Sequence, residues 1–358
     1  MPVHPDTAAW LTLEAVPGLG PESVRALLAE FGNPDAVLAA SSTQLGRVLD
    51  QRLAAAIHLA ATTGPAQAAV DWLAAPDNHL IPVGDPAYPS QLQDLPDAPV
   101  WLYVKGDPAW LARPMLAIVG SRNATPQGLR DAYAFAQTLS EAGLTIVSGL
   151  ALGIDAAAHE GGLAGLASSV AVVGTGLDRV YPARNRDLAH RLAAQGALVS
   201  EFALGTEPRP GHFPRRNRLI SGLSLGVLVI EAAPESGSLI TARLAGEQGR
   251  EVFAIPGSIH SALSKGCHRL IRQGAKLVET ATDVLEELGR RLPVQPAPYA
   301  GSLSEDSLLD ALATGPLATD QLADRLGLTV EALSVSLLEA EMDGRVARMP
   351  GGLYQRLY

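Results

Sequence analysis

The sequence has one cysteine, Cys267, so neither an internal disulfide bond nor a zinc site made of several cysteines can form. Its apolar runs fall short of the ~18 to 20 residues that a membrane-spanning helix needs. The first residues carry Asp6 and Glu14 and lack the basic start of a secretory signal. We therefore expect a cytoplasmic protein with no membrane partner. Cys267 is a weak candidate nucleophile, because no motif typical of a catalytic cysteine surrounds it.

Aromatic side chains make up only 4 % of the 358 residues, so the core must be built from small aliphatic side chains. A chain of this length is typical of two or three domains, one of which can bury a substantial core. No spacing of histidines and carboxylates typical of a metal site occurs, and we expect neither a metal nor a cofactor.

The net charge of −10 would argue against a nucleic-acid partner if it were spread evenly. Residues 1–80 hold eight acids and three bases, and residues 301–358 hold nine acids and four bases. Residues 81–300 hold 20 of each and are neutral, with their arginines in clusters. A local positive groove is therefore feasible in the middle of the chain.

The densest basic cluster is residues 211–218, which read Gly-His-Phe-Pro-Arg-Arg-Asn-Arg without an acid. Arginine binds phosphate oxygens in pairs, and an aromatic face accepts any nucleobase. The cluster is therefore typical of a sequence-tolerant contact to a single strand. A solvated basic turn before a helix has the same composition, and this interpretation stays open at this point.

Residues 1–78 are predicted to form a small helical domain similar to SAM or helix-hairpin-helix modules. Residues 16–23 read Val-Pro-Gly-Leu-Gly-Pro-Glu-Ser and precede a helix. A glycine turn of this kind can offer backbone N–H groups to a phosphate. Because eight acids accompany it, we favour an interaction role for this domain over DNA binding.

Residues 79–292 are predicted to form a Rossmann-like α/β domain with a mostly parallel sheet. Residues 76–114 are rich in proline, and we interpret them as a linker with an edge strand near residues 100–104. Short β-branched runs then alternate with helical stretches, which indicates parallel strands joined by right-handed crossovers. The expected strands are residues 116–119, 144–147, 169–173, 197–199, 227–230, 251–255 and 276–278.

Residues 293–303 are predicted to be a second linker, and residues 304–358 a winged-helix-like domain of three helices and a hairpin. The third helix, residues 330–343, carries four acids and no base. A helix that reads duplex DNA needs base-reading and phosphate-binding side chains. We therefore favour a protein-contact or regulatory role for this domain.

Glycine-rich or polar turns follow the expected strands, at the edge where an open parallel sheet binds its ligands. Glycine lets the backbone approach a ligand, and helix N-termini attract anions. One such turn would be an ordinary connection, but several turns with arginines predict a phosphate-binding surface. The candidate DNA-binding residues are Ser121, Arg122, Gly149, Gly153, Gly174, Gly176, Arg179, Arg184, Asn185, Arg186, Phe213, Arg216, Asn217, Arg218, Ser236, Gly237, Ser238, Thr241 and Lys265.

These turns carry no recognisable enzyme motif. The glycines do not reproduce the G-x-G-x-x-G dinucleotide fingerprint, and neither a P-loop nor a Ser-His-Asp arrangement is present. Asp155 and His159 share a helix face through their i, i+4 spacing, which is more often structural than catalytic. We therefore expect a protein that is not an enzyme.

Taken in order, the motifs resemble those of the DNA-processing protein A (DprA/Smf) family. The similarity covers essentially the whole middle domain. It rests on Gly-Ser-Arg at 120–122, on the glycine turns within 148–159 and 174–182, and on the motifs within 213–223, 231–242, 256–258 and 270–275. Many ordered motifs make the similarity specific, and the terminal domains also resemble the family's optional arms.

The resemblance implies a non-catalytic protein that binds single-stranded DNA, protects incoming strands during natural transformation and loads the RecA recombinase onto them. It also implies a homodimer through the Rossmann-like domain. By the same resemblance, Arg122, Arg216 and Arg218, with Arg184 or Arg186, would hold phosphates, and Phe213 would stack on a base. Arg215 occupies a variable position of the motif, and we expect it to be a solvated charge.

Two other functions stay open. A nucleotide-processing enzyme of the phosphoribohydrolase kind uses a similar sheet, with a phosphate loop where residues 236–239 lie and a glutamate such as Glu231 for chemistry. The Ser-Gly-Ser sequence and the many arginines disfavour it. A structural adaptor whose terminal domains bind the partner is the third possibility.

Overall fold

The computed structural model describes residues 6–289, 308–309, 311–312, 315–326, 330–349 and 352–357. The chain divides into two compact units, Met1–Arg291 and Leu292–Tyr358. The predicted linker at residues 293–303 lies outside the described residues. Along the described ranges, no helix combines the length and the apolar character needed to cross a bilayer.

Residues 78–277 of the first unit form a nine-stranded sheet in the order β1-β2-β6-β5-β4-β3-β7-β8-β9. The strands β3 to β9 pair in parallel, whereas β2 pairs antiparallel with both β6 and β1. The predicted mostly parallel α/β sheet is confirmed. The strands are β1 Asn78–Pro82, β2 Trp101–Gly106, β3 Met115–Gly120, β4 Thr145–Ser148, β5 Ser169–Val172, β6 Ala197–Ser200, β7 Gly226–Ile230, β8 Glu251–Ala254 and β9 Lys276–Leu277.

The start of the sheet differs from the sequence prediction. Residues 78–82, interpreted as part of a linker, form the edge strand β1, so β2 is the second strand and not the edge. Its two aliphatic residues, Leu80 and Ile81, are too few to stand out among the surrounding prolines, and pairing with all of residues 101–105 secures the strand. The expected domain boundary after residue 78 therefore falls inside a strand.

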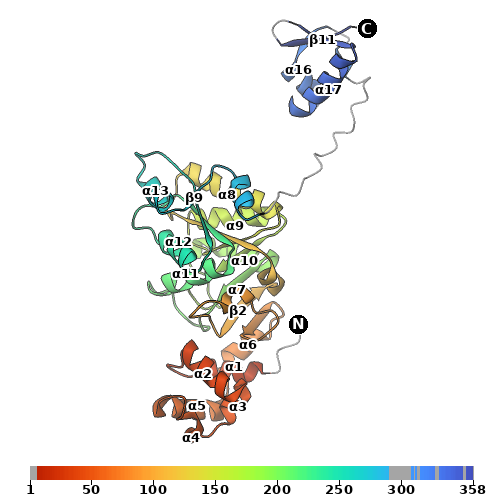
Figure 1. The fold of residues 1–358 in the computed structure, drawn as a ribbon. Coiled ribbons are helices and arrows are strands. Elements are labelled where there is room, and N and C mark those ends of the chain that lie inside the picture. Colours follow the sequence, from red (N-terminus) through yellow and green to blue (C-terminus); the bar gives the residue numbers. More distant parts are fainter. Residues whose placement is uncertain are drawn as a thin grey trace. The chain divides into compact units, whose positions relative to one another are not determined.

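Helices cover both faces of this sheet (Figure 1). The side chains of Ala117 and Val119 pack toward α7, α11, α12 and α13, while Leu116 and Ile118 pack toward α8, α9 and α14. Burial on both faces explains why the strands read as continuous apolar runs. The helices are α7 Ser90–Gln93, α8 Pro126–Glu141, α9 Ile154–Ala164, α10 Arg186–Gln195, α11 His212–Leu223, α12 Ser238–Glu247, α13 Lys265–Arg272 and α14 Ala281–Glu287.

The first strand of the parallel series, β3, lies in the middle of the sheet. The chain adds β4, β5 and β6 on one side of β3, and then β7, β8 and β9 on the other. The loops that leave β3 and β7 therefore diverge to opposite faces. This divergence creates a crevice at the carboxyl ends of the two strands, the usual ligand position in an open α/β sheet.

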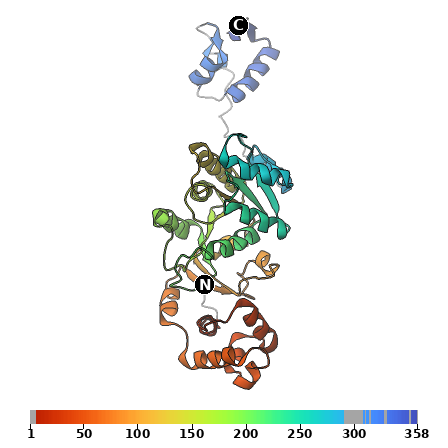
Figure 2. The ribbon, with the colours of Figure 1, turned by 90° about the vertical axis from the view of Figure 1, so that its left-hand side faces the viewer.

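The N-terminal helices, coloured red to orange, gather in one cluster (Figure 2). Its α1 helix packs on the sheet through Trp10, whose ring meets Trp101 edge-on at 6.3 Å, and Arg25 of α2 donates to the carbonyl of Ala98. These helices therefore belong to the same compact unit as the sheet. They are α1 Thr7–Glu14, α2 Pro21–Phe31, α3 Pro34–Ala39, α4 Ser42–Leu45, α5 Gln51–Thr63 and α6 Gln67–Leu73.

The second unit contains a three-stranded sheet in the order β10-β12-β11, with two helices in the part that the structure describes. It has its own apolar core, which includes Leu322, Leu333 and Val346. The predicted winged-helix arrangement is confirmed, although most of the first helix expected at 304–313 lies outside the described residues. The elements are β10 Leu317–Ala318, α16 Thr319–Leu326, α17 Val330–Met342, β11 Val346–Met349 and β12 Leu353–Arg356.

The contact between α1 and the sheet is predicted to make stability depend on pH. Burial raises the pKa of Glu14 from 4.5 to about 7, partly opposed by the nearby hydroxyl group of Tyr103. Because the folded pKa lies above the unfolded one, Glu14 favours the folded state below pH 4.5, and this contribution is lost as the pH rises to about 7. We expect Glu14→Gln to raise the thermal midpoint at pH 8 and to leave it unchanged near pH 4.

The matched control for this experiment is Glu30→Gln, which removes an exposed carboxylate from α2. Its effect on the thermal midpoint should show no such dependence on pH. A stabilisation by Glu14→Gln that is the same at pH 4 and pH 8 would contradict the prediction.

Candidate nucleic-acid interface

A cavity of about 720 Å³ opens at the carboxyl ends of β3 and β7, in the crevice that the topology creates. Three segments supply most of its wall, within residues 119–123, 210–220 and 233–241. We call it the arginine pocket. It brings together nine predicted DNA-binding residues, which are Ser121, Arg122, Phe213, Arg216, Asn217, Ser236, Gly237, Ser238 and Thr241.

Arg122 stands at the exposed rim of the arginine pocket, on the turn that leaves β3. The start of α9 stabilises this turn, because the backbone N–H of Ile154 donates to the carbonyl of Ser121 at 3.1 Å. Gly153 has a φ of 78° and leaves no space for a Cβ beside that carbonyl, so only glycine fits there. The Arg122 guanidinium lies 5.7 Å from the centre of the Phe213 ring.

Two aromatic rings form one wall of the pocket. The rings of Phe213 and Tyr181 lie 5.7 Å apart at an angle of 33°, and Tyr181 is 47 % exposed. A Cβ added to Gly174 would lie 3.2 Å from the Phe213 ring, so the glycine turn after β5 makes room for that ring. The motif at 174–182 includes Tyr181, but the sequence alone does not single out Tyr181 as a binding residue.

Arg216 lies beneath the pocket and is only 5 % exposed. Its Nη1 donates to the carbonyl of Gly149 at 2.6 Å and to that of Val172, and its Nε donates to Asn217 Oδ1 at 3.2 Å. A Cβ at Gly149 would lie 2.5 Å from this guanidinium, which therefore fills the space of a side chain there. Burial lowers the pKa of Arg216 to about 10, so the side chain stays protonated at neutral pH.

Asp155 and His159 support the same loop from inside. The Asp155 carboxylate accepts from the Gly149 N–H at 3.1 Å. Nε2 of His159 accepts from the Leu150 N–H at 3.3 Å, so Nδ1 carries the proton and donates to Ser169 Oγ at 2.7 Å. Burial lowers the pKa of His159 to about 3 and keeps the ring neutral. The predicted structural role of this pair is supported.

The opposite wall is the start of α12. Nδ2 of Asn217 donates to the carbonyl of Gly237 at 3.4 Å, which ties α11 to this turn. The hydroxyl groups of Ser236 and Ser238 lie 2.7 Å apart, and Thr241 completes the first turn of α12. The N–H groups of Ser238, Leu239 and Ile240 already donate hydrogen bonds within this turn. The wall therefore offers an anion its hydroxyl groups and the partial positive charge of a helix N-terminus.

Arg218 lies outside the arginine pocket, contrary to the expectation that it holds a phosphate. Its Nη2 binds Glu201, its Nε lies 3.1 Å from Asp97 Oδ2, and its side chain is 8 % exposed. Arg215, expected to be a solvated charge, also pairs with Glu201, at 3.1 Å and 3.2 Å. The two arginines therefore neutralise a buried carboxylate.

The other predicted residues support the pocket or lie beside it. The Nδ2 group of Asn185 is directed inward and donates to the carbonyl of Leu150 at 2.9 Å. Arg179 lies 3.6 Å from Asp178, whereas Arg184 and Arg186 are exposed. Residues outside the pocket lining are Gly149, Gly153, Gly174, Gly176, Arg179, Arg184, Asn185, Arg186, Arg218 and Lys265.

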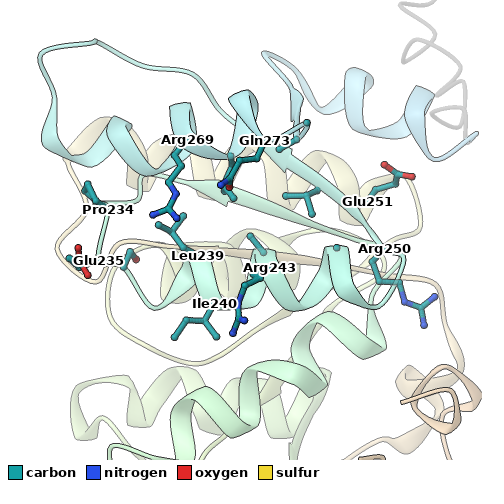
Figure 3. Close-up of a pocket in the computed structure, with 16 residues that line it drawn as sticks. Pro234, Glu235, Leu239, Ile240, Arg243, Arg250, Glu251, Arg269 and Gln273 are labelled. Carbon is teal, nitrogen blue, oxygen red and sulfur yellow. The ribbon is translucent and has the colours of Figure 1, made fainter. Parts of the chain in front are cut away.

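Another cavity, of about 660 Å³, lies between α12 and α13 (Figure 3). Figure 3 shows Arg269 directed from α13 toward Leu239 on α12, with Glu235 and Glu251 at the two ends. None of the described residues that line it is aromatic, and Arg243 pairs with Glu247 at 3.3 Å. Both cavities have acids and arginines in their lining, but only the arginine pocket has aromatic rings among its described lining residues, so it is the better site for a nucleic acid.

The candidate catalytic groups have structural contacts. The Glu231 carboxylate accepts from the N–H and the hydroxyl of Thr125, the N-cap residue of α8. Cys267 is 1 % exposed, and burial raises the pKa of its thiol to about 11, which disfavours the nucleophilic thiolate. Both groups are therefore engaged in the packing of the fold, and neither is among the described lining residues of the arginine pocket.

The fold is that of a doubly wound α/β protein, with a pocket lined by arginines and aromatic rings at the carboxyl ends of its central strands. A family model described as DNA recombination-mediator protein A matches residues 79–289, and one described as DprA winged helix domain matches residues 293–352. Protein Smf of Escherichia coli (strain K12) is 43 % identical, over 98 % of this chain and 96 % of its own length. The chain belongs to the DNA-processing protein A (DprA/Smf) family.

Two solved structures agree with this assignment. DNA processing protein A from Streptococcus pneumoniae superposes with a TM-score of 0.70 at 37 % identity, covering 80 % of this chain and 98 % of its own. DNA processing protein A from Helicobacter pylori superposes with a TM-score of 0.53 at 32 % identity, covering 56 % and 92 %. The latter structure describes a single-stranded DNA binding mode of that protein.

The different positions of the arginines predict different effects on stability. Arg218→Ala leaves the Glu201 carboxylate buried with one partner fewer, and we expect it to lower the free energy of unfolding by about 3 kcal/mol. Arg122→Ala removes an exposed side chain and should change it by less than about 0.5 kcal/mol. Urea denaturation measures both. Equal losses would contradict the placement of Arg218 as a structural residue.

Proposed function

We propose that this protein is a single-stranded DNA-binding recombination mediator whose strand lies in the arginine pocket. The observation that carries the proposal is the grouping of Arg122, Phe213 and Tyr181 opposite the start of α12. The guanidinium and the helix N-terminus favour phosphate, while the ring faces favour a base. None of these contacts depends on base identity, so the site should accept any sequence.

The residues have distinct roles in this proposal. Arg122, at the exposed rim, binds a phosphate directly, and Phe213 and Tyr181 stack on a base. Asn217 and the first turn of α12 receive a second phosphate. Arg216 adds fixed positive charge from below and holds the Gly149 loop. Arg184 and Arg186 are exposed, three and five residues after Tyr181 in the chain, and offer further phosphate contacts.

The wider role follows from the family. We infer that the protein protects incoming single strands and helps to load RecA onto them during natural transformation in the cytoplasm. It does so as a homodimer through the Rossmann-like domain. The relatives named as DNA processing proteins and the single-stranded DNA binding mode described for the Helicobacter pylori relative support this proposal. The occupied contacts of Glu231 support a binding role without catalysis.

The salt dependence of binding tests the direct phosphate contact. Each phosphate that a protein neutralises on a single strand contributes ~0.7 to the slope of log K against log salt. Arg122→Ala should therefore reduce the slope by about one such step and weaken binding to any sequence alike. Titration of labelled oligothymidylate at several salt concentrations measures the slope.

Arg130→Ala is the matched control, because it also removes an exposed arginine, from α8 and outside the pocket. It should leave the slope unchanged. Equal affinity of the wild-type protein for single strands and blunt duplex, or an unchanged slope in Arg122→Ala, would exclude the arginine pocket as the binding site.

The aromatic wall predicts a different kind of loss. Phe213→Ala removes a stacking surface that is worth about 1 to 3 kcal/mol per base, so affinity should fall roughly five-fold or more. The salt slope should stay at the wild-type value, because no charge changes. The conservative variant Phe213→Tyr should retain most of the affinity. A slope that falls in Phe213→Ala as much as in Arg122→Ala would contradict the stacking role.

A further inference from the structure

A separate cavity of about 600 Å³ lies between α6, β2, α10 and the turn that follows Leu177. It is distinct from the arginine pocket and shares no described lining residue with it. Its wall combines cationic and aromatic side chains over an aliphatic floor. The lining residues that the argument uses are Trp72, Lys105, Arg179, Ala183, Arg186 and His190, and we call this cavity the junction pocket.

The cations of the junction pocket come from three separate elements. Lys105 lies on β2 and donates one Nζ hydrogen to Asn78 Oδ1 at 3.0 Å, which positions the ammonium. Arg186 and His190 are exposed and lie four residues apart on α10, so they share one face of that helix. Among the described residues of the lining, Asp178 is the one acid. The pocket therefore favours an anion.

Arg179, in the same wall, has one N–H donor without a hydrogen bond among the described residues. Its Nε is buried and makes no hydrogen bond within the described residues, because the Asp178 carboxylate is 3.6 Å away. Arg179 also lies near a second acid, because Oε1 of the largely exposed Glu207 is 3.8 Å from its Nη1. A phosphate oxygen could accept the hydrogen bond that these carboxylates do not.

The junction pocket also contains an aromatic surface. The half-buried Trp72 of α6 lies edge-on to Tyr103, with ring centres 5.7 Å apart at 77°, which fixes the plane of the indole. Tryptophan offers a large face on which any base can stack. Cations beside a fixed ring match the chemistry of a nucleotide unit, phosphate together with base.

The two pockets lie on either side of one turn. Tyr181 lines the arginine pocket, Ala183 lines the junction pocket, and only Pro182 separates them along the chain. Asn185, which ends the short helix η2 (Ala183–Asn185), donates to the carbonyl of Leu150 and so holds this turn. Exposed Arg184 stands on the same turn.

We propose that a strand leaving the rings of Phe213 and Tyr181 crosses this turn and places a following nucleotide in the junction pocket. Its phosphate is held by Lys105 and Arg186, and its base lies against Trp72. This extension rests on the proposed function of the arginine pocket. It gives the N-terminal helices a part in DNA binding through Trp72, although their charge is acidic.

Strand length provides the test. We compare oligothymidylates of increasing length on the wild-type protein and on Lys105→Gln/His190→Gln, at pH 8 and one salt concentration. The amide that replaces the Lys105 ammonium can keep a bond to Asn78, so the variant loses the Lys105 charge without losing that contact. We expect the variant to bind the shortest strands like wild type and longer strands about ten-fold more weakly.

Arg191→Ala is the control, because it removes one charge from the exposed side of α10 outside both pockets. It should bind all lengths like wild type. If it lowers the affinity for long strands as much as Lys105→Gln/His190→Gln does, the loss is a general electrostatic effect and the junction pocket is not the binding site. Equal affinity of the double variant and wild type at every length also overturns the proposal.

Arg122→Ala separates the two proposals. If it weakens every length while Lys105→Gln/His190→Gln weakens none, the arginine pocket stands and only the extension fails. If it weakens none, the proposed function itself fails. Thymidine monophosphate tests whether the junction pocket binds a free nucleotide instead of a strand. If wild type binds the monophosphate, the double variant does not, and both bind strands equally well, the pocket is a site for free nucleotides and the extension fails. Unchanged thermal midpoints confirm that each variant is folded.

Discussion

The contact between the Arg216 guanidinium and the carbonyls of Gly149 and Val172 is the one on which the rest of the site depends. A guanidinium buried without acceptors would strongly destabilise the fold, so these carbonyls hold α11 across the ends of β4 and β5. The glycine at 149 follows, because the guanidinium fills the space of a side chain. The same contact places Phe213 in the pocket wall, because Phe213 lies one turn earlier on the same helix.

Helix periodicity then divides the basic cluster between two tasks. Phe213, Arg216, Asn217 and Ile220 follow the i, i+3, i+4, i+7 pattern of one helix face, and all four line the arginine pocket. Arg215 and Arg218 lie three residues apart on another face and both bind Glu201. The cluster is therefore neither a solvated turn nor a row of equivalent phosphate contacts. Much of its arginine charge serves the fold.

The sequence predicts the sheet better than it predicts the site. Strands buried on both faces are continuous apolar runs, so the seven parallel strands are found within one or two residues, whereas the short β1 is hidden among prolines. Which arginines are exposed is set by acids far away in the chain. Glu201 lies 17 residues from Arg218, and Asp97 lies on a different segment. A local motif therefore cannot predict which of its arginines pair with such distant acids.

Two buried basic groups near the site each keep one protonation state around neutral pH. Burial lowers the pKa of both, but Arg216 begins so high that a value of about 10 still leaves it charged, whereas His159 falls to about 3 and stays neutral. Neither group changes its charge between pH 5 and pH 8. The Arg216 guanidinium therefore stays charged in this range, but it does not set the charge of the pocket alone, because Asp155 in the same lining is a buried carboxyl whose pKa is raised by burial. Ionic strength, through screening and counterion release, is a further variable that controls the attraction of the exposed Arg122 for a strand.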